Sequence, residues 1–222
     1  SSKHTVISYK NDISQFLNCI GEVTIPEVTS KDVRYWISEL SKEGIAPKSI
    51  NRKITAIRSF FYYLQQQNRL SQNVARKVHS LKTKKRLPNF VEEEKMNILL
   101  DQNFFSEGFV GLRDKTIIEL LYTTGIRRAE LLGLTLQSID FSDGSMKVFG
   151  KRSKERIVPL LPECIALLKT YIVERNKIAD CDALFVTEKG KACYDKMIYR
   201  IVHNYLSSVT TIDKRSPHVL RH

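Results

Sequence analysis

The sequence lacks the features that would place it in a membrane or outside the cell. Its apolar stretches are far shorter than the roughly 20 residues that cross a bilayer, and its first residues contain no signal-peptide core. Its four cysteines, Cys19, Cys164, Cys181 and Cys193, lie far apart without a Cys-x-x-Cys pair, so neither a disulfide framework nor a zinc site is indicated. We therefore expect a cytoplasmic protein with reduced core thiols.

The sequence also has few acidic residues relative to basic ones. Lys and Arg number 36 against 24 Asp and Glu, which gives a formal net charge of +12. The first 82 residues carry 13 of the basic residues against 6 acidic ones. A polyanion is therefore the first candidate partner, and because 42% of the residues are hydrophobic the chain can form one or two ordinary cores.

A short basic run divides the chain. Residues 82–86 read Lys-Thr-Lys-Lys-Arg, show no apolar periodicity and are followed by Leu87-Pro88. We interpret residues 83–88 as a linker between a domain at 1–82 and a second domain at 89–222. Such a linker is either a solvated tether or a segment that lies along a phosphate backbone, where Lys84, Lys85 and Arg86 would bind.

The first domain has a helical pattern throughout. Apolar residues recur at helical spacing between positions 6 and 20, between 33 and 40, and in a stripe from Ile50 to Leu64. Thr29 or Ser30 is placed to cap the second helix, Pro47 to begin the third, and residues 71–78 predict a short fourth helix. The fold expected here is a small helical bundle.

The third helix has a polar face opposite its apolar stripe. A helix with such a face can enter the major groove of DNA, although a solvated helix face gives the same pattern. The candidate DNA-binding residues on or beside this face are Lys48, Asn51, Arg52, Thr55 and Arg58.

The second domain has a mixed pattern. Helices are predicted at residues 91–100, 109–122, 127–134, 162–178 and 193–206, and strands at 146–149 and 156–160 flank a polar loop. The fold class is therefore mainly α: a helical bundle followed by a mixed α+β domain with a small antiparallel sheet.

Three short segments of this domain could carry chemistry. The first segment is Thr124-Gly125-Ile126-Arg127-Arg128-Ala129-Glu130, in which Gly125 places Arg127 at the start of a helix. The guanidinium of Arg127 could bind phosphate oxygens there, or it could simply pair with Glu130 on the surface. The hairpin tip at 150–156 contains Lys151, Arg152 and Lys154 and is either a soluble turn or a loop with a lysine poised to donate a proton. His218 and Arg221 share one face of a helix that Ser216-Pro217 could begin, which by itself is a common structural arrangement.

In this order, the helical basic domain, the linker, TGIRRAELLGL, VFGKRSKERIVPL and HVLRH resemble the tyrosine recombinase (lambda-integrase-like) family over essentially the whole chain, and especially its Xer branch and related phage and mobile-element integrases. The resemblance implies a SAM-like, core-binding first domain and a catalytic second domain.

The resemblance also implies site-specific cleavage and rejoining of double-stranded DNA through a 3′-phosphotyrosine, without ATP, cofactor or metal. Arg127 and Arg221 would hold the phosphate and Glu130 would brace the site. Lys151 would protonate the departing 5′ oxygen, and His218 would handle the nucleophile's proton. Two guanidiniums suit this chemistry, because a transferring phosphoryl group spreads negative charge over its non-bridging oxygens.

One part of the family pattern is missing. The nucleophilic tyrosine is expected some helical turns after the His-x-x-Arg box, but all nine tyrosines precede His218. We therefore expect a C-terminally truncated catalytic domain without its nucleophile, inactive in cleavage and monomeric without DNA, whereas the full-length protein would form a tetramer on paired sites. The rival hypotheses are a non-catalytic DNA-binding protein that keeps the fold and a basic structural protein.

Overall fold

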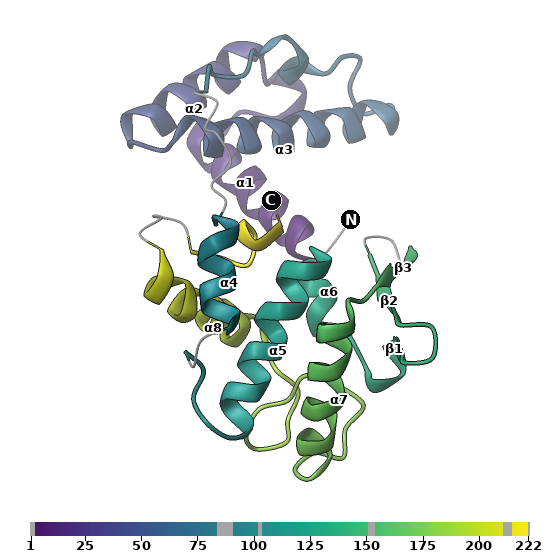
Figure 1. Ribbon diagram of the computed structural model, residues 1–222. Helices are drawn as coiled ribbons and strands as arrows, with labels where there is room; N and C mark the ends of the chain where they lie inside the picture. The colour runs from purple at the N-terminus through teal and green to yellow at the C-terminus, as the bar shows by residue number, and fades with distance from the viewer. Residues whose placement is uncertain (1–2, 84–90, 102–103, 151–153, 211–214, 222) are drawn as a thin grey trace. The chain divides into compact units, whose positions relative to one another are not determined.

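The computed structural model describes residues 3–83, 91–101, 104–150, 154–210 and 215–221 (Figure 1). The chain divides into two compact units, Ser1–Arg86 and Leu87–His222, and this division falls inside the segment predicted as a linker. The protein is mainly helical, as predicted, with a helical first unit and a second unit that combines helices with one three-stranded antiparallel sheet.

Unit 1 is a bundle of three helices, α1 (Lys3–Ile20), α2 (Ser30–Lys42) and α3 (Pro47–Gln66), with 3-10 turns at Ile25–Glu27 and Val74–Lys77. Thr29 caps α2 by accepting a hydrogen bond from the Lys31 amide. Phe16, Trp36 and Phe61 meet edge to face at the centre of the core, with the Phe16 ring 5.3 Å from Trp36 and 6.2 Å from Phe61. The apolar stripe predicted on α3 is the face that packs into this core.

The fourth helix expected at residues 71–78 is instead a single 3-10 turn, η2 (Val74–Lys77). Asn73 caps this turn through the Ala75 amide, so helical backbone begins only at residue 74. The Arg58 guanidinium then donates to the carbonyl oxygens of Ala75 and Val78. Both carbonyls therefore accept from a side chain of α3, and the Ala75 carbonyl also accepts from the Val78 amide at 3.3 Å.

Unit 2 is built around a buried helix, α5 (Phe109–Thr124), whose Ile117, Ile118, Leu120 and Leu121 have no exposed surface. α5 packs against α7 (Pro162–Asn176), α8 (Asp195–Val209) and the 3-10 turn η5 (Val219–Arg221). α4 (Glu93–Asp101) and the five-residue α6 (Arg128–Leu132) pack against α8.

The sheet has the order β1 (Ile139–Asp140), β2 (Ser145–Phe149), β3 (Glu155–Pro159), with both pairs antiparallel. In the β2–β3 ladder Val148 lies opposite Arg156 and Lys147 opposite Ile157. Directly paired residues point to the same face, so Arg156 shares the inward face with buried Val148, while Lys147 and Ile157 face outward. β1 was not predicted, since two residues are too few for a periodic pattern.

The cysteines are only partly core residues, in contrast to the expectation. Cys164 and Cys193 are buried, and burial raises the pKa of each thiol to about 11. Cys181 is exposed and Cys19 is half-buried. None of the helices in the described part of the chain is both long and apolar enough to cross a membrane.

Candidate active site

Arg127 lies in the sharp connection between α5 and α6. Gly125 ends α5 in the left-handed conformation, with φ of 58°, and its amide donates to the Leu121 carbonyl at 3.1 Å. Ile126 is fully buried, and Arg127 follows as the N-cap of α6 with extended backbone rather than in the first helical turn, where it was predicted. The backbone of Arg127 is therefore held between a core anchor and a helix start, while 54% of its side chain is exposed.

Glu130, three residues later, is the centre of a hydrogen-bonded ion cluster. Its side chain is only 4% exposed, and its Oε2 accepts from the Arg127 backbone amide at 2.8 Å. Its Oε1 accepts from Nη1 of the Arg127 guanidinium at 2.7 Å. The carboxylate thus holds both the backbone and the side chain of Arg127, and the bracing role of Glu130 in a reaction stays a prediction.

A third member of this cluster, Arg156 on β3, was missed from the sequence. It grips Glu130 with two parallel hydrogen bonds, Nη1 to Oε1 at 3.0 Å and Nη2 to Oε2 at 2.7 Å. The hydrogen bonds from Arg156 are the main cause that lowers the pKa of Glu130 to about 2, with those from Arg127 adding to it against the opposing effect of burial. A signal was present in the alternation of Glu155-Arg156-Ile157-Val158, which places a charged residue at an inward position of the strand.

The base of the β2–β3 loop touches this cluster. The Gly150 amide donates to the Lys154 carbonyl at 2.8 Å, which closes the loop above the last strand pair. A Cβ atom built on Gly150 would lie 3.5 Å from Arg156 Nη1 and 3.6 Å from Glu130 Oε1. Lys154 is exposed, whereas Lys151 and Arg152 lie outside the described residues.

The His-x-x-Arg segment packs on α5. The structure has the short turn η5 where a helix was predicted after Pro217, and Val219 and Leu220 of this turn belong to the core of unit 2. His218 precedes this turn and is exposed. Figure 1 shows η5 and α6 toward the same end of unit 2. The backbone of Arg221 ends η5, and its side chain lies outside the described residues, so the predicted convergence of Arg127 and Arg221 stays a prediction.

On α3, the candidate DNA-binding residues fall into two groups. Asn51 and Arg58 have partners inside unit 1: the Asn51 side chain donates to the Leu81 carbonyl at 2.9 Å and accepts from the Leu81 amide at 2.7 Å, and Arg58 holds η2. Lys48 and Thr55 are exposed.

Arg52 both has partners inside unit 1 and keeps an exposed side chain. Its guanidinium forms two hydrogen bonds with the buried carboxylate of Asp12, at 2.5 Å and 2.9 Å, and one with Ser8 at 2.5 Å. The Arg52 side chain nevertheless remains 47% exposed. Lys84, Lys85 and Arg86 lie outside the described residues.

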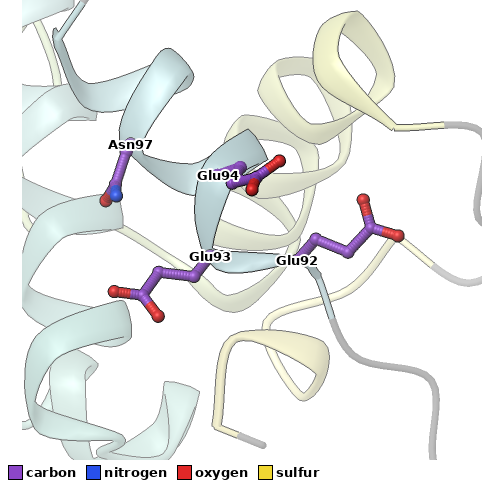
Figure 2. A pocket seen from close by; sticks show the side chains of 4 residues that line it. All are labelled: Glu92, Glu93, Glu94 and Asn97. Atoms are coloured by element: carbon purple, nitrogen blue, oxygen red, sulfur yellow. The ribbon is translucent and has the colours of Figure 1, made fainter.

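A hollow at the start of α4 is lined by Glu92, Glu93, Glu94 and Asn97 (Figure 2). The carboxylates of Glu92 and Glu93 point away from each other in this view, and Glu92 pairs with Lys95 at 2.9 Å. The hollow is acidic and therefore unsuited to a phosphate. Among the described residues, no group of three or more His, Cys, Asp or Glu side chains is placed to share a metal ion.

Both units of the chain are similar to known proteins. Residues 89–222 match the Phage integrase family, and residues 1–68 match the family's N-terminal SAM-like domain. The tyrosine recombinase XerC of Thermodesulfovibrio yellowstonii is 36% identical over 228 residues, covering 100% of this chain and 75% of the relative. XerD of Chlorobaculum tepidum is 35% identical over 231 residues with the same coverage. The chain thus spans about three quarters of the length of these relatives.

Solved structures share the fold. The XerH site-specific recombinase in a post-cleavage complex with a palindromic difH substrate superimposes with a TM-score of 0.82 and 20% identity, over 98% of this chain and 66% of XerH. The Tn1549 transposon integrase in complex with transposon right end DNA gives 0.80 and 21% identity, over 100% of this chain and 79% of the integrase. The family models, together with the Xer relatives that are 35–36% identical, show that the chain belongs to the tyrosine recombinase (phage integrase) family, among its Xer-like members.

Proposed function

We propose that this chain supplies the DNA-binding domain and most of the catalytic domain of a site-specific recombinase that cleaves and rejoins DNA strands through a 3′-phosphotyrosine. The observation that carries the proposal is Arg127, an exposed guanidinium whose backbone and side chain are both held by a buried carboxylate. A fixed cation of this kind offsets charge on a phosphoryl group without reorganising during the reaction.

In the proposed reaction, a tyrosine oxygen attacks the scissile phosphorus and the bond to the 5′ oxygen breaks. Arg127 and Arg221 hold the non-bridging oxygens, Lys151 donates a proton to the departing 5′ oxygen, and His218 takes the proton of the tyrosine. The same groups act in reverse when a 5′ hydroxyl attacks the phosphotyrosine. Because the covalent intermediate conserves the phosphodiester bond energy, no ATP is needed.

No tyrosine of this chain follows the His-x-x-Arg box, and Tyr171, one of the nine that precede it, is unsuited to attack a phosphate. Its hydroxyl lies in the core, donates to the Leu184 carbonyl at 3.2 Å and accepts from the Val186 amide at 3.1 Å. Burial raises its pKa strongly. We therefore propose that this chain binds DNA without becoming linked to it, and that the tetramer on paired sites forms only with the longer protein.

DNA is proposed to lie against the exposed polar side chains of α3, Lys48, Arg52 and Thr55, and against the basic residues of the linker and the hairpin, Lys84, Lys85, Arg86, Arg152 and Lys154. Most of these contacts would be to phosphates, which position the protein without reading sequence. Asn51 and Arg58 already hold other parts of unit 1 and would support the shape of this surface rather than its contacts.

The test begins with a duplex recovered from a random library by repeated binding to this chain. A nicked suicide version of that duplex is incubated with the chain and with an extended chain in which a tyrosine follows the box, and the products are separated under denaturing conditions. We expect a covalent band only from the extended chain, lost in its Arg127→Ala variant and kept in its Lys147→Gln control. If the extended chain binds the duplex but gives no covalent band, the result would favour the alternative, a non-catalytic DNA-binding protein with the recombinase fold.

A further inference from the structure

The charges in the Glu130 cluster do not cancel. Arg127 and Arg156 each carry one positive charge and Glu130 one negative charge, so the cluster has a net charge of +1. Each carboxylate oxygen accepts one hydrogen bond from each arginine residue, which uses the acceptor capacity of the group. The three side chains therefore form one saturated unit with a surplus cation.

The two arginines take unequal parts in this unit. Arg156 binds Glu130 with both terminal nitrogens, the paired geometry in which guanidinium and carboxylate fit best. The Arg127 guanidinium donates to the carboxylate through a single nitrogen, Nη1. The Arg127 side chain is also the more exposed of the two, with an exposed fraction of 54% against 40% for Arg156. Within the described part of the chain, most of its five N–H donors thus remain for another anion.

We propose that Arg156 is a positioning residue: by carrying the charge of Glu130, it leaves the Arg127 guanidinium available to the scissile phosphate. This inference rests on the proposed function. Without Arg156, the buried carboxylate would have two vacant acceptor sites beside Arg127, and leaving a buried charge unpaired is strongly unfavourable. Arg127 would then turn both of its terminal nitrogens onto Glu130, and the cluster would be neutral.

Arg156 also ties the hairpin to α6. Arg156 lies opposite Val148 in the β2–β3 ladder, and Val148 is two residues before Gly150. A Cβ atom built on Gly150 would lie 3.5 Å from Nη1 of Arg156. The residue that follows Gly150 is Lys151, the proposed proton donor. The same ion pair that frees Arg127 therefore also fastens the base of the lysine loop next to it.

If Arg156 acts through charge, the availability of Arg127 should differ among variants in an order that a merely structural role of Arg156 would not produce. Arg156→Gln brings the cluster from +1 to zero, whereas the double variant Glu130→Gln, Arg156→Gln returns it to +1. Arg127 should therefore be captured in the single variant and released in the double one.

The experiment uses the selected duplex with a neutral methylphosphonate at one phosphate at a time, bound by this chain and its variants. A position that senses Arg127 is one where the substitution weakens binding of the wild-type chain but not of Arg127→Ala, by about tenfold or more for a charge-assisted contact. At that position, we expect Arg156→Gln to lose most of the sensitivity and the double variant to regain it. The control Lys147→Gln removes a charge from the outward face of the same sheet and should keep it.

The outcomes separate the inference from the proposed function. If no position senses Arg127, the proposed role of Arg127 fails first. If such a position exists but Arg156→Gln keeps its full sensitivity, the inference is overturned while the proposed function stands. If the double variant stays as insensitive as the single one, Arg156 contacts the phosphate itself or only supports the fold, and the inference is again overturned.

Discussion

Replacing Glu130 by Gln should lower the stability of unit 2 by an amount that depends on pH. Glu130 has a pKa of about 2 in the folded chain against an ordinary value of 4.5. A carboxyl with a lowered folded pKa stabilises the fold above its unfolded pKa, and that contribution disappears as pH falls toward the folded value. From the two pKa values, the contribution of ionised Glu130 is about 3 kcal/mol at pH 6 and about 1 kcal/mol at pH 3.

Urea unfolding at pH 6 and pH 3 measures this difference. The single tryptophan, Trp36, lies in the core of unit 1, so its fluorescence reports that unit, and the remaining transition in circular dichroism reports unit 2. The control is Glu174→Gln, whose exposed pair with Lys177 should matter by less than about 1 kcal/mol at either pH. A Glu130→Gln penalty in unit 2 that is the same at both pH values would refute the assigned ionisation of Glu130.

Three further predictions concern other parts of the chain. DNA affinity should fall by at least about a hundredfold between 50 and 200 mM salt in a titration series, because phosphate contacts release counterions, and a flat log–log plot would contradict this. Asn51→Ala should destabilise unit 1 by roughly 1–3 kcal/mol in unfolding followed by Trp36 fluorescence, since it leaves the Leu81 amide and carbonyl unpaired. Lys48→Ala should instead weaken DNA binding while the stability of unit 1 stays unchanged. Gly111→Ala should destabilise unit 2 by more than about 1 kcal/mol in the circular dichroism transition, because its Cβ would stand 1.7 Å from the carbonyl oxygen of Ser106; wild-type stability would show that the backbone there yields easily.

The elements that were predicted well are those with a long local pattern. The stripe from Ile50 to Leu64 defines α3, and Gly125 marks the end of α5, because helical spacing and a left-handed cap are properties of neighbouring residues. Arg127 and Glu130 were found together for the same reason, since they are three residues apart.

The contacts that were missed join residues distant in sequence. Arg156 reaches Glu130 across 26 positions, and Asn51 reaches Leu81 across 30. Both pairs depend on how a strand or a chain end folds back onto a helix, which a local pattern does not encode. A polar residue on a helix face therefore looks equally free whether it meets solvent, DNA or the backbone of the next segment.

The Glu130 cluster limits which groups could give the proposed reaction its pH dependence. Its carboxyl has a pKa of about 2, Glu130 raises the pKa of the Arg156 guanidinium, and arginine side chains in general keep their proton in proteins. The charge that the cluster presents is thus constant throughout the range in which an enzyme would be assayed. Any bell-shaped rate profile near neutral pH would then report groups outside this cluster rather than a change in how Arg127 binds the phosphate.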